Sequence, residues 1–298
     1  MNKLFNFLCR LFIFGIPCVF STKTNAREYH IRLLDKANGQ PVAYAVICIP
    51  GTNIGSYSNE SGDATLNIGK ENSDKTLVVS LIGYENYNTN VSDLTDRPDS
   101  GIYIVCLAKT EYKLAEVFIK PRRLTFAELG NDVDCDTTAT GGLPIPYYFQ
   151  RKKTGVKDTM TEVGTLMKVK HKKTYIDSVQ INIGRCSYES IFYRLNIYEK
   201  IDDEFKNILK EPIYIERDGR DIGRIIKVDL SDKGLVVNNN FIVSIEKVKD
   251  LGPGELTVCG KMLGASAYVR AATRLEQFFN VPIVGIGIAA FVTFSEDY

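Results

Sequence analysis

From residue 28 onward the chain alternates apolar and polar side chains with a period of two, which is the spacing of a half-buried β-strand. Turn residues such as Gly, Asn, Asp and Pro separate about seven short runs of this kind before residue 110. The runs cover residues 28–34, 42–49, 55–58, 63–68, 75–82, 86–91 and 102–107. Short strands with regular turns and no helical stretch predict an antiparallel β-sandwich over residues 27–109.

A second block of strand patterns begins near residue 161 and continues to the end of the chain. Its runs cover residues 161–170, 176–183, 191–198, 212–215, 224–230, 235–237, 241–248, 256–259 and 283–294. Eight to ten strands predict a second sandwich over residues 147–298, of jelly-roll-like architecture. Residues 110–146 are rich in Gly and Pro, so we interpret them as a linker. The expected fold class is therefore all-β, with two sandwiches in tandem.

The turn residues of the first block stand in a characteristic order. They are Asp35, Gly39, Pro41, Val42, Ala45 and Val46, then Gly51, Thr52, Gly55, Asn59, Glu60 and Gly62, then Leu77, Val79, Ser80, Ile82, Gly83 and Tyr84. In this order the block resembles the carboxypeptidase-regulatory-like domain. The resemblance implies a seven-stranded, transthyretin-like sandwich of the kind common in exported proteins of Bacteroidetes-type bacteria. It implies no peptidase activity, because no metallocarboxypeptidase catalytic domain accompanies it.

Domains of this family also precede the plug of TonB-dependent outer-membrane receptors, and residues 114–119 resemble the short strand that joins the two. The rest of the chain is far too short for the barrel of such a receptor. The resemblance therefore implies an accessory or regulatory partner of a receptor as an alternative function. Residues 192–198 and 228–231 resemble a C-terminal β-domain of the same exported proteins, which adds architecture and no activity.

The first 26 residues have the pattern of a signal peptide. Lys3 and Arg10 provide positive charge, residues 11–20 are apolar, and small residues up to Ala26 provide a cleavage site. We expect export to the periplasm, the outer membrane or the medium, with no transmembrane span after cleavage. An uncleaved anchor is the alternative, although the apolar run is short for a membrane span.

Five cysteines remain after the predicted signal peptide, and no two of them form a C-x-x-C pair. Cys48 and Cys106 both lie in apolar strand patterns. The pattern favours buried free thiols that act as small apolar side chains. A Cys48–Cys106 disulfide is the alternative, since an exported protein can form disulfides.

Charge and composition exclude some function classes. The chain has 37 Lys and Arg against 36 Asp and Glu, a net charge of +1 that gives no overall field for nucleic acid. Only His30 and His171 remain after the signal peptide, and neither has an acid and a nucleophile in a recognisable pattern. We nominate no catalytic residue and no cofactor.

One candidate metal site is an acidic segment in the predicted linker. Asp132, Asp134 and Asp136 place carboxylates at alternate positions, and calcium favours such oxygen clusters. Thr137 stands where a calcium loop needs glycine, and Leu143 stands where it needs glutamate. A solvated acidic linker is the favoured interpretation, with calcium as the alternative.

Two further groups are candidates for ligand binding. Tyr147, Tyr148 and Phe149 either stack on sugar rings or attach the linker to the second sandwich. A second group, predicted to share one face of a strand, consists of Lys168, Lys170 and Lys172. These lysines either protect a strand edge from unwanted pairing or bind an anionic glycan or lipid.

The expected function is a non-catalytic binding or structural module of the cell envelope, whose partner is an envelope protein or a glycan. The alternatives are a partner of a TonB-dependent receptor and a hydrolase with a carboxylate or metal site in the second sandwich. Two converging carboxylates in a cleft would favour the hydrolase.

Overall fold

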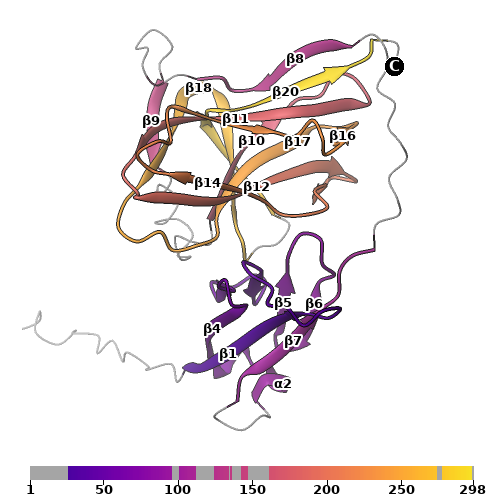
Figure 1. Ribbon diagram of the computed structural model, residues 1–298, viewed down its shortest axis with the longest axis vertical. Helices are drawn as coiled ribbons and strands as arrows, with labels where there is room; N and C mark the ends of the chain where they lie inside the picture. The colour runs from indigo at the N-terminus through magenta and orange to yellow at the C-terminus, as the bar shows by residue number, and fades with distance from the viewer. Residues whose placement is uncertain are drawn as a thin grey trace, which may run out of the picture.

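The computed structural model describes residues 26–95, 101–111, 124–133, 135, 142–146, 161–273 and 277–296. The predicted signal peptide, residues 1–26, lies outside these residues except for Ala26, where the first strand begins. Figure 1 shows two β-structures, a small sandwich at the N-terminal side and a large sandwich that includes the C-terminal strands. The prediction of an all-β fold is confirmed.

The small sandwich contains seven strands in two sheets. They are β1 (Ala26–Asp35), β2 (Val46–Cys48), β3 (Gly55–Tyr57), β4 (Asp63–Gly69), β5 (Thr76–Ser80), β6 (Tyr87–Asn90) and β7 (Tyr103–Leu107), with a 3-10 turn η1 (Lys70–Asn72) and a short helix α2 (Val91–Thr95). One sheet has the order β4-β1-β7 and the other the order β3-β2-β5-β6. Alternate residues such as Leu33, Ile47 and Leu77 point between the sheets and are fully buried. The seven-stranded sandwich is therefore confirmed, but β1 and β7 pair in parallel, so the expectation of a wholly antiparallel sandwich was wrong.

The characteristic turn residues have structural reasons. Asp35 is buried at the end of β1, where its carboxylate accepts hydrogen bonds from the Ala37 amide at 2.8 Å and from the Tyr84 hydroxyl at 2.9 Å. Gly62 adopts a φ of +75°, and a Cβ at this position would lie 2.5 Å from the Leu33 carbonyl oxygen. The turn therefore requires glycine on both steric and conformational grounds.

The large sandwich contains the remaining strands. They are β8 (Thr125–Gly130), β9 (Gly142–Pro146), β10 (Thr161–Met167), β11 (Thr174–Cys186), β12 (Ser190–Ile201), β13 (Glu204–Asn207), β14 (Ile213–Asp218), β15 (Ile225–Asp229), β16 (Val236–Val237), β17 (Phe241–Lys247), β18 (Leu256–Ala271), β19 (Phe279–Ile286) and β20 (Ile288–Phe294). The strand β11 pairs with β20 through residues 175–181 and with β18 through residues 183–186, so it connects the strands of the two layers into one continuous sheet. Between them lies an extensive apolar core that includes Tyr193, Leu195 and Val243.

Two strands lie in the interval that the sequence analysis interpreted as a linker. The strand β8 pairs with β20, and β9 pairs with β18. Pro144 and Pro146 suggested a break in structure, but a proline is tolerated in a strand at the edge of a sheet. These residues extend the large sandwich.

The structure has a disulfide that the sequence analysis did not consider, and it leaves Cys48 and Cys106 free, as the favoured interpretation expected. Cys135 and Cys259, 124 residues apart in sequence, form a disulfide between the segment after β8 and strand β18. Cys48 and Cys106 are both free. They lie on the outer faces of different sheets, because Ile47 and Val105 beside them point into the core between these sheets. A Cys48–Cys106 disulfide was therefore the wrong alternative, and Cys106 is exposed and not buried.

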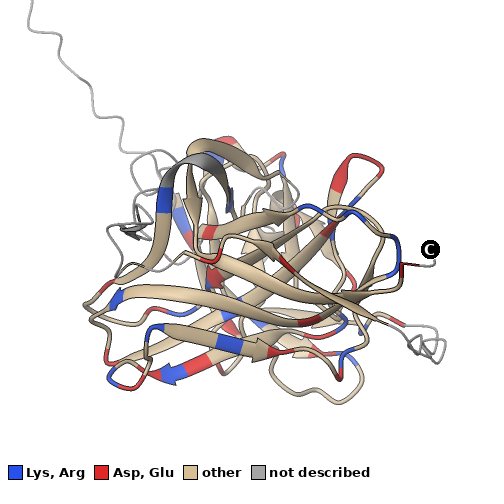
Figure 2. Cartoon of the chain, turned by 90° about the horizontal axis from the view of Figure 1, so that it is seen from above, with Lys and Arg blue, Asp and Glu red and all other residues tan. Residues whose placement is uncertain are grey.

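Among the described residues, no helix has the length and apolar character that crossing a membrane requires. Positive and negative side chains are interspersed along the strands in the view of Figure 2, in keeping with the balanced net charge.

Candidate functional site

The most unusual side chains of the large sandwich lie on the outer face of the sheet β12-β17-β10-β18. On β12, Arg194, Asn196 and Tyr198 occupy alternate positions, and the residues between them pack into the apolar core on the opposite face. Polar residues at alternate positions normally face solvent. Here Arg194 and Asn196 have exposures of only 4% and 1%.

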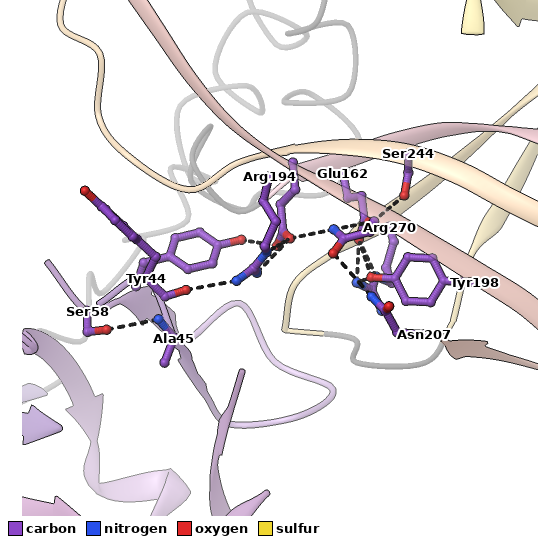
Figure 3. Close-up of polar contacts among 12 residues, drawn as sticks. Tyr44, Ala45, Ser58, Glu162, Arg194, Tyr198, Asn207, Ser244 and Arg270 are labelled. Carbon is purple, nitrogen blue, oxygen red and sulfur yellow. Dashed lines mark hydrogen bonds and ion pairs between the residues drawn. The ribbon is translucent and has the colours of Figure 1, made fainter. Parts of the chain in front are cut away.

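The strand register brings four charged residues into one row. Arg194 of β12 is opposite Glu246 of β17, Glu246 is opposite Glu162 of β10, and Glu162 is opposite Arg270 of β18. These four residues, which we name the charge row, cross four neighbouring strands in the order plus, minus, minus, plus (Figure 3). The two carboxylates are 0% and 1% exposed, so the charges need partners within the protein.

Each carboxylate has an arginine beside it. Arg194 donates from Nε and Nη2 to Oε2 of Glu246 at 3.0 and 2.8 Å. Arg270 donates from Nε to Oε2 of Glu162 at 2.8 Å, and its Nη2 also contacts this oxygen and the Tyr198 hydroxyl. Hydrogen bonds between charged groups are roughly twice as strong as those between neutral groups.

Two like charges nevertheless adjoin at the centre of the row, and an amide connects them. The Nδ2 group of Asn196 donates one hydrogen bond to Glu162 at 2.9 Å and another to Glu246 at 3.0 Å. The Ser244 hydroxyl also donates to Oε1 of Glu162, whereas Arg270 contacts the other oxygen, Oε2. These neutral donors satisfy the carboxylates without adding charge, so the row remains balanced.

The environment favours the charged forms. Burial alone would raise the pKa of Glu246, but the charges of Arg194 and Arg270 and the hydrogen bond from Tyr57 outweigh burial and lower this pKa below its ordinary value of 4.5. Burial opposes the charge of each arginine as well, yet the carboxylates raise the pKa values of both guanidinium groups. The row therefore favours the charged forms of Glu246 and of both arginines.

The small sandwich completes this network. The Tyr57 hydroxyl of β3 donates to Oε1 of Glu246, and Nη1 of Arg194 donates to the Tyr44 carbonyl oxygen at 3.0 Å. Tyr44 adopts an unusual φ of +60°, with its ring 4.8 Å from that of Phe192. Burial and the nearby Glu246 raise the pKa of Tyr57, so its hydroxyl stays protonated and able to donate.

Apolar and backbone contacts extend the same interface. A small apolar cluster, contributed by both sandwiches, consists of Val46, Cys48, Ala271 and Ala272. Gly83 adopts a φ of +86°, and a Cβ there would lie 2.8 Å from the carbonyl oxygen of Lys210 in the large sandwich. The backbones of the two sandwiches therefore approach so closely here that only glycine fits.

A cavity of about 400 Å³ lies between the two sandwiches beside the charge row. Arg194, Asn196 and Arg270 form part of its wall from the large sandwich, and residues 80–84 line it from the small one. Its volume is within the range of small-molecule sites, which often lie between domains. Glu246 also lines the cavity, but every oxygen of Glu162 and Glu246 already accepts a hydrogen bond from the protein. The other acid of the wall is Glu204, which is exposed and lies 3.8 Å from the ammonium group of Lys206.

The predicted acidic segment is only partly described. The carboxylate of Asp132 accepts hydrogen bonds from Asn182 at 2.7 Å and Gln180 at 3.2 Å, while Asp134 and Asp136 lie outside the described residues. Within the described part of the chain, no group of three or more His, Cys, Asp or Glu side chains could hold a metal ion. Calcium binding by this segment stays a prediction.

The predicted ligand-binding residues have different outcomes. Tyr147, Tyr148 and Phe149 lie outside the described residues. Lys168 and Lys170 are exposed and line a hollow of about 750 Å³, whereas Lys172, also exposed, is not part of its wall.

The expectation that the three lysines share a strand face was wrong. The strand β10 ends at Met167, and residues 168–173 form the connection to β11. Val169 and His171 alternate with the lysines and imitate a strand, but residues 168–173 form no ladder with a neighbouring strand.

Sequence reasoning missed the charge row entirely. Only Glu162 is the single charged residue of its strand, whereas β12, β17 and β18 contain further charged residues, so the sequence offered little signal for the row. The pairing order β12-β17-β10-β18, which is not the order of the strands in the sequence, is what brings them together.

Comparisons with known proteins give one family match and only distant structural likenesses. Residues 32–119 match the model of the CarboxypepD_reg-like domain. No curated protein matches the chain.

Two solved structures illustrate how distant the likenesses are. The cysteine protease and lectin-like domains of Cwp84, a surface layer associated protein of Clostridium difficile, are 12% identical, with a TM-score of 0.33 over 45% of this chain and 32% of that one. The VP2 subviral particle of infectious bursal disease virus is 11% identical, with a TM-score of 0.27 over 84% and 59%. The chain thus spans about a third of the first structure and less than two thirds of the second. The family assignment rests on the small sandwich alone: the N-terminal part of the chain, residues 32–119, is a CarboxypepD_reg-like domain.

Proposed function

We propose that the chain is a non-catalytic binding module of the cell envelope, in which the charge row fixes the CarboxypepD_reg-like domain to the large sandwich. One observation carries this proposal. All four carboxylate oxygens of Glu162 and Glu246 accept hydrogen bonds from protein groups, and one of these donors, Tyr57, comes from the small sandwich. The most highly charged cluster of the described interior is thus used to hold two domains together.

The same geometry argues against a hydrolase, although two carboxylates do converge. A general acid needs a proton to donate, and such a carboxyl group has a raised pKa and access to substrate. Glu246 has a lowered pKa and an exposure of 1%, and Glu162 has an exposure of 0%. Neither side chain can reach a bound substrate without breaking its arginine pair.

Two features support a location outside the cytoplasm. The first 26 residues have the charge and hydrophobicity pattern of a signal peptide. The Cys135–Cys259 disulfide is of a type that persists in oxidising compartments. We therefore propose that the protein acts in the periplasm, at the outer membrane or outside the cell.

A TonB-dependent receptor is the alternative partner for this module. The family match extends through residue 119 and so includes the segment that resembles the junction to a receptor plug. Co-purification of a receptor of this class with the tagged full chain would favour this alternative over a glycan partner.

The test combines cell fractionation with an activity screen on the purified full chain. We expect an epitope-tagged chain to be found in the envelope or medium with its disulfide formed. We also expect the chain to hydrolyse neither glycosides nor peptides at a rate above that of buffer. The variants Glu162→Gln and Glu246→Gln serve as matched controls, because both keep the shape of the side chain.

Two results would refute the proposal. One is recovery of the reduced protein in the cytoplasm. The other is a hydrolytic activity that Glu246→Gln or Glu162→Gln abolishes while the circular dichroism spectrum stays unchanged.

A further inference from the structure

The large sandwich has a second hollow, separate from the interface with the small sandwich. Its volume is about 750 Å³, and its wall is formed by β8, the end of β10, β18 and β19. Figure 1 shows β8 on the side of the large sandwich that faces away from the small one. None of its lining residues belongs to the charge row.

The cations of this hollow have no partners. Lys168 and Lys170 are exposed, and neither ammonium group has a hydrogen bond or an ion pair with any described residue. Many other lysines of the chain contact a carboxylate, namely Lys109, Lys200, Lys206, Lys233 and Lys249. Two neighbouring unpaired ammonium groups at a concave surface are a favourable place for anionic groups.

The acid in the wall is Glu128. Burial and the neighbouring Asp132 raise the pKa of Glu128 above its ordinary value. Two lysines against this one glutamate leave the wall of the hollow with an excess of positive charge.

Neutral polar groups form much of the remaining wall. Ser266 provides a hydroxyl, Asn280 provides an amide, and Tyr268 provides both a hydroxyl and a half-buried ring. Donors and acceptors of this kind beside an aromatic ring suit a ligand with many hydroxyl groups.

The rim is also strained. Ile283 of β19 adopts a φ of +77°, a conformation that β-branched residues rarely adopt, and its side chain is 51% exposed. It lies where the pairing of β18 with β19 shifts register, between Met262 and Ser266. Bulges and backbone strain of this kind are common at binding sites, where they direct a side chain toward a ligand.

We propose that this hollow binds an acidic saccharide, with Lys168 and Lys170 contacting its carboxylate or sulfate groups. Ser266 and Asn280 then hydrogen-bond sugar hydroxyls, and Tyr268 and Ile283 contact the ring faces. The inference rests on the proposed function, for which it names the ligand class. A bilayer surface fits less well, because its headgroups form a broad plane whereas the lysines lie at a concave wall with hydroxyl and amide groups.

The experiment measures binding of the full chain to two acidic polysaccharides, polygalacturonate and dextran sulfate, by isothermal titration calorimetry. Neutral dextran and phosphatidylglycerol vesicles serve as comparison probes. The test variant is Lys168→Glu/Lys170→Glu. The control variant, Lys36→Glu/Lys75→Glu, makes the same change in net charge at exposed lysines of the small sandwich, outside the hollow.

We expect the native chain to bind at least one acidic polysaccharide, more weakly at higher salt, and neutral dextran much less. The test variant should lose roughly tenfold or more in affinity, since two attractive contacts become repulsive, while the control stays within about twofold. Replacement of Tyr268 by Ala should weaken binding without changing the salt dependence.

The proposal is overturned by equal losses in the test and control variants, by equal binding of neutral dextran, or by binding to the vesicles alone. These outcomes differ from failure of the proposed function. An envelope protein without hydrolytic activity that ignores both polysaccharides refutes only the ligand, whereas a cytoplasmic or hydrolytic protein refutes the function itself.

Discussion

The two sandwiches differ in how they treat polar side chains. The small sandwich has an almost wholly apolar interior, and its buried polar residues are Asp35, Ser58 and Asn72 among those described. The large sandwich also buries residues with charged side chains, namely Glu162, Arg194, Glu199, Glu246, Lys247 and Arg270. The buried charges of the charge row lie on the sheet face that the small sandwich covers, so the difference reflects the interface. Buried ion pairs are weak evidence for stability as such, and here they fit better with a fixed and specific arrangement of domains.

The largest expected effect concerns the row itself. The substitution Glu246→Ala leaves Arg194 buried without its counter-charge and should destabilise the protein by about 3–5 kcal/mol. Urea unfolding followed by tyrosine fluorescence would measure this loss.

The matched control is Asp63→Ala in the small sandwich. Asp63 pairs with Arg32 at 2.6 Å, but both side chains are more than a third exposed, so this change should destabilise the protein far less than Glu246→Ala. Similar losses for both variants would contradict the contrast between the two sandwiches.

Removal of the disulfide should have the next largest effect. The double variant Cys135→Ala/Cys259→Ala should lose about 2–4 kcal/mol, because the cross-link no longer restricts the unfolded chain. Thermal unfolding with and without reductant measures it, with Cys106→Ala as the control because this thiol is free and exposed. The unfolding temperature of the large sandwich should fall. A decrease confined to the small sandwich would contradict the Cys135–Cys259 pairing.

Acid should reduce the contribution of Glu246 to the free energy of unfolding. The pKa of Glu246 is lowered in the folded protein, so its ionised form stabilises the fold fully above the ordinary value of 4.5. That contribution is lost as the pH falls through the lower folded pKa. The difference in unfolding free energy between the native chain and Glu246→Gln should therefore be largest near neutral pH and shrink below pH 4.5. A difference that does not vary with pH would show that Glu246 is not ionised.

The smallest effects compare two contacts across the interface. Tyr57→Phe removes a hydrogen bond to a buried carboxylate and should cost about 1.5–3 kcal/mol. Lys249→Ala removes an exposed ion pair with Glu60, in which the side chains are 46% and 68% exposed, and should cost about 0–1 kcal/mol. Chemical denaturation of both variants gives the ranking, and a larger loss for Lys249→Ala would reverse it.

Much of the fold could be predicted because it follows from local patterns. Strict alternation gave the seven strands of the small sandwich, and Asp35 and Gly62 act within a few residues of the turns that they stabilise. The strands β8 and β9 were missed, because their glycines and prolines resemble those of a linker and only pairing with distant strands shows otherwise.

The site was much less accessible to prediction. The same alternation that identified β12 assigned Arg194 and Asn196 to a solvated face, since a single sequence does not say that a second domain covers this face. Lys168 and Lys170 were noticed for their charge, but the hollow beside them depends on a register shift between β18 and β19.

The hydroxyl of Tyr57 limits how freely the N-terminal module could be exchanged. Grafting another sandwich of the same family onto this chain would leave Oε1 of Glu246 without a donor, unless the graft presents a hydroxyl at the same point. The small residues at the contact and the glycine at position 83 add a requirement of shape. A chimera with another N-terminal sandwich therefore needs a hydroxyl donor, such as a tyrosine, at the position of Tyr57.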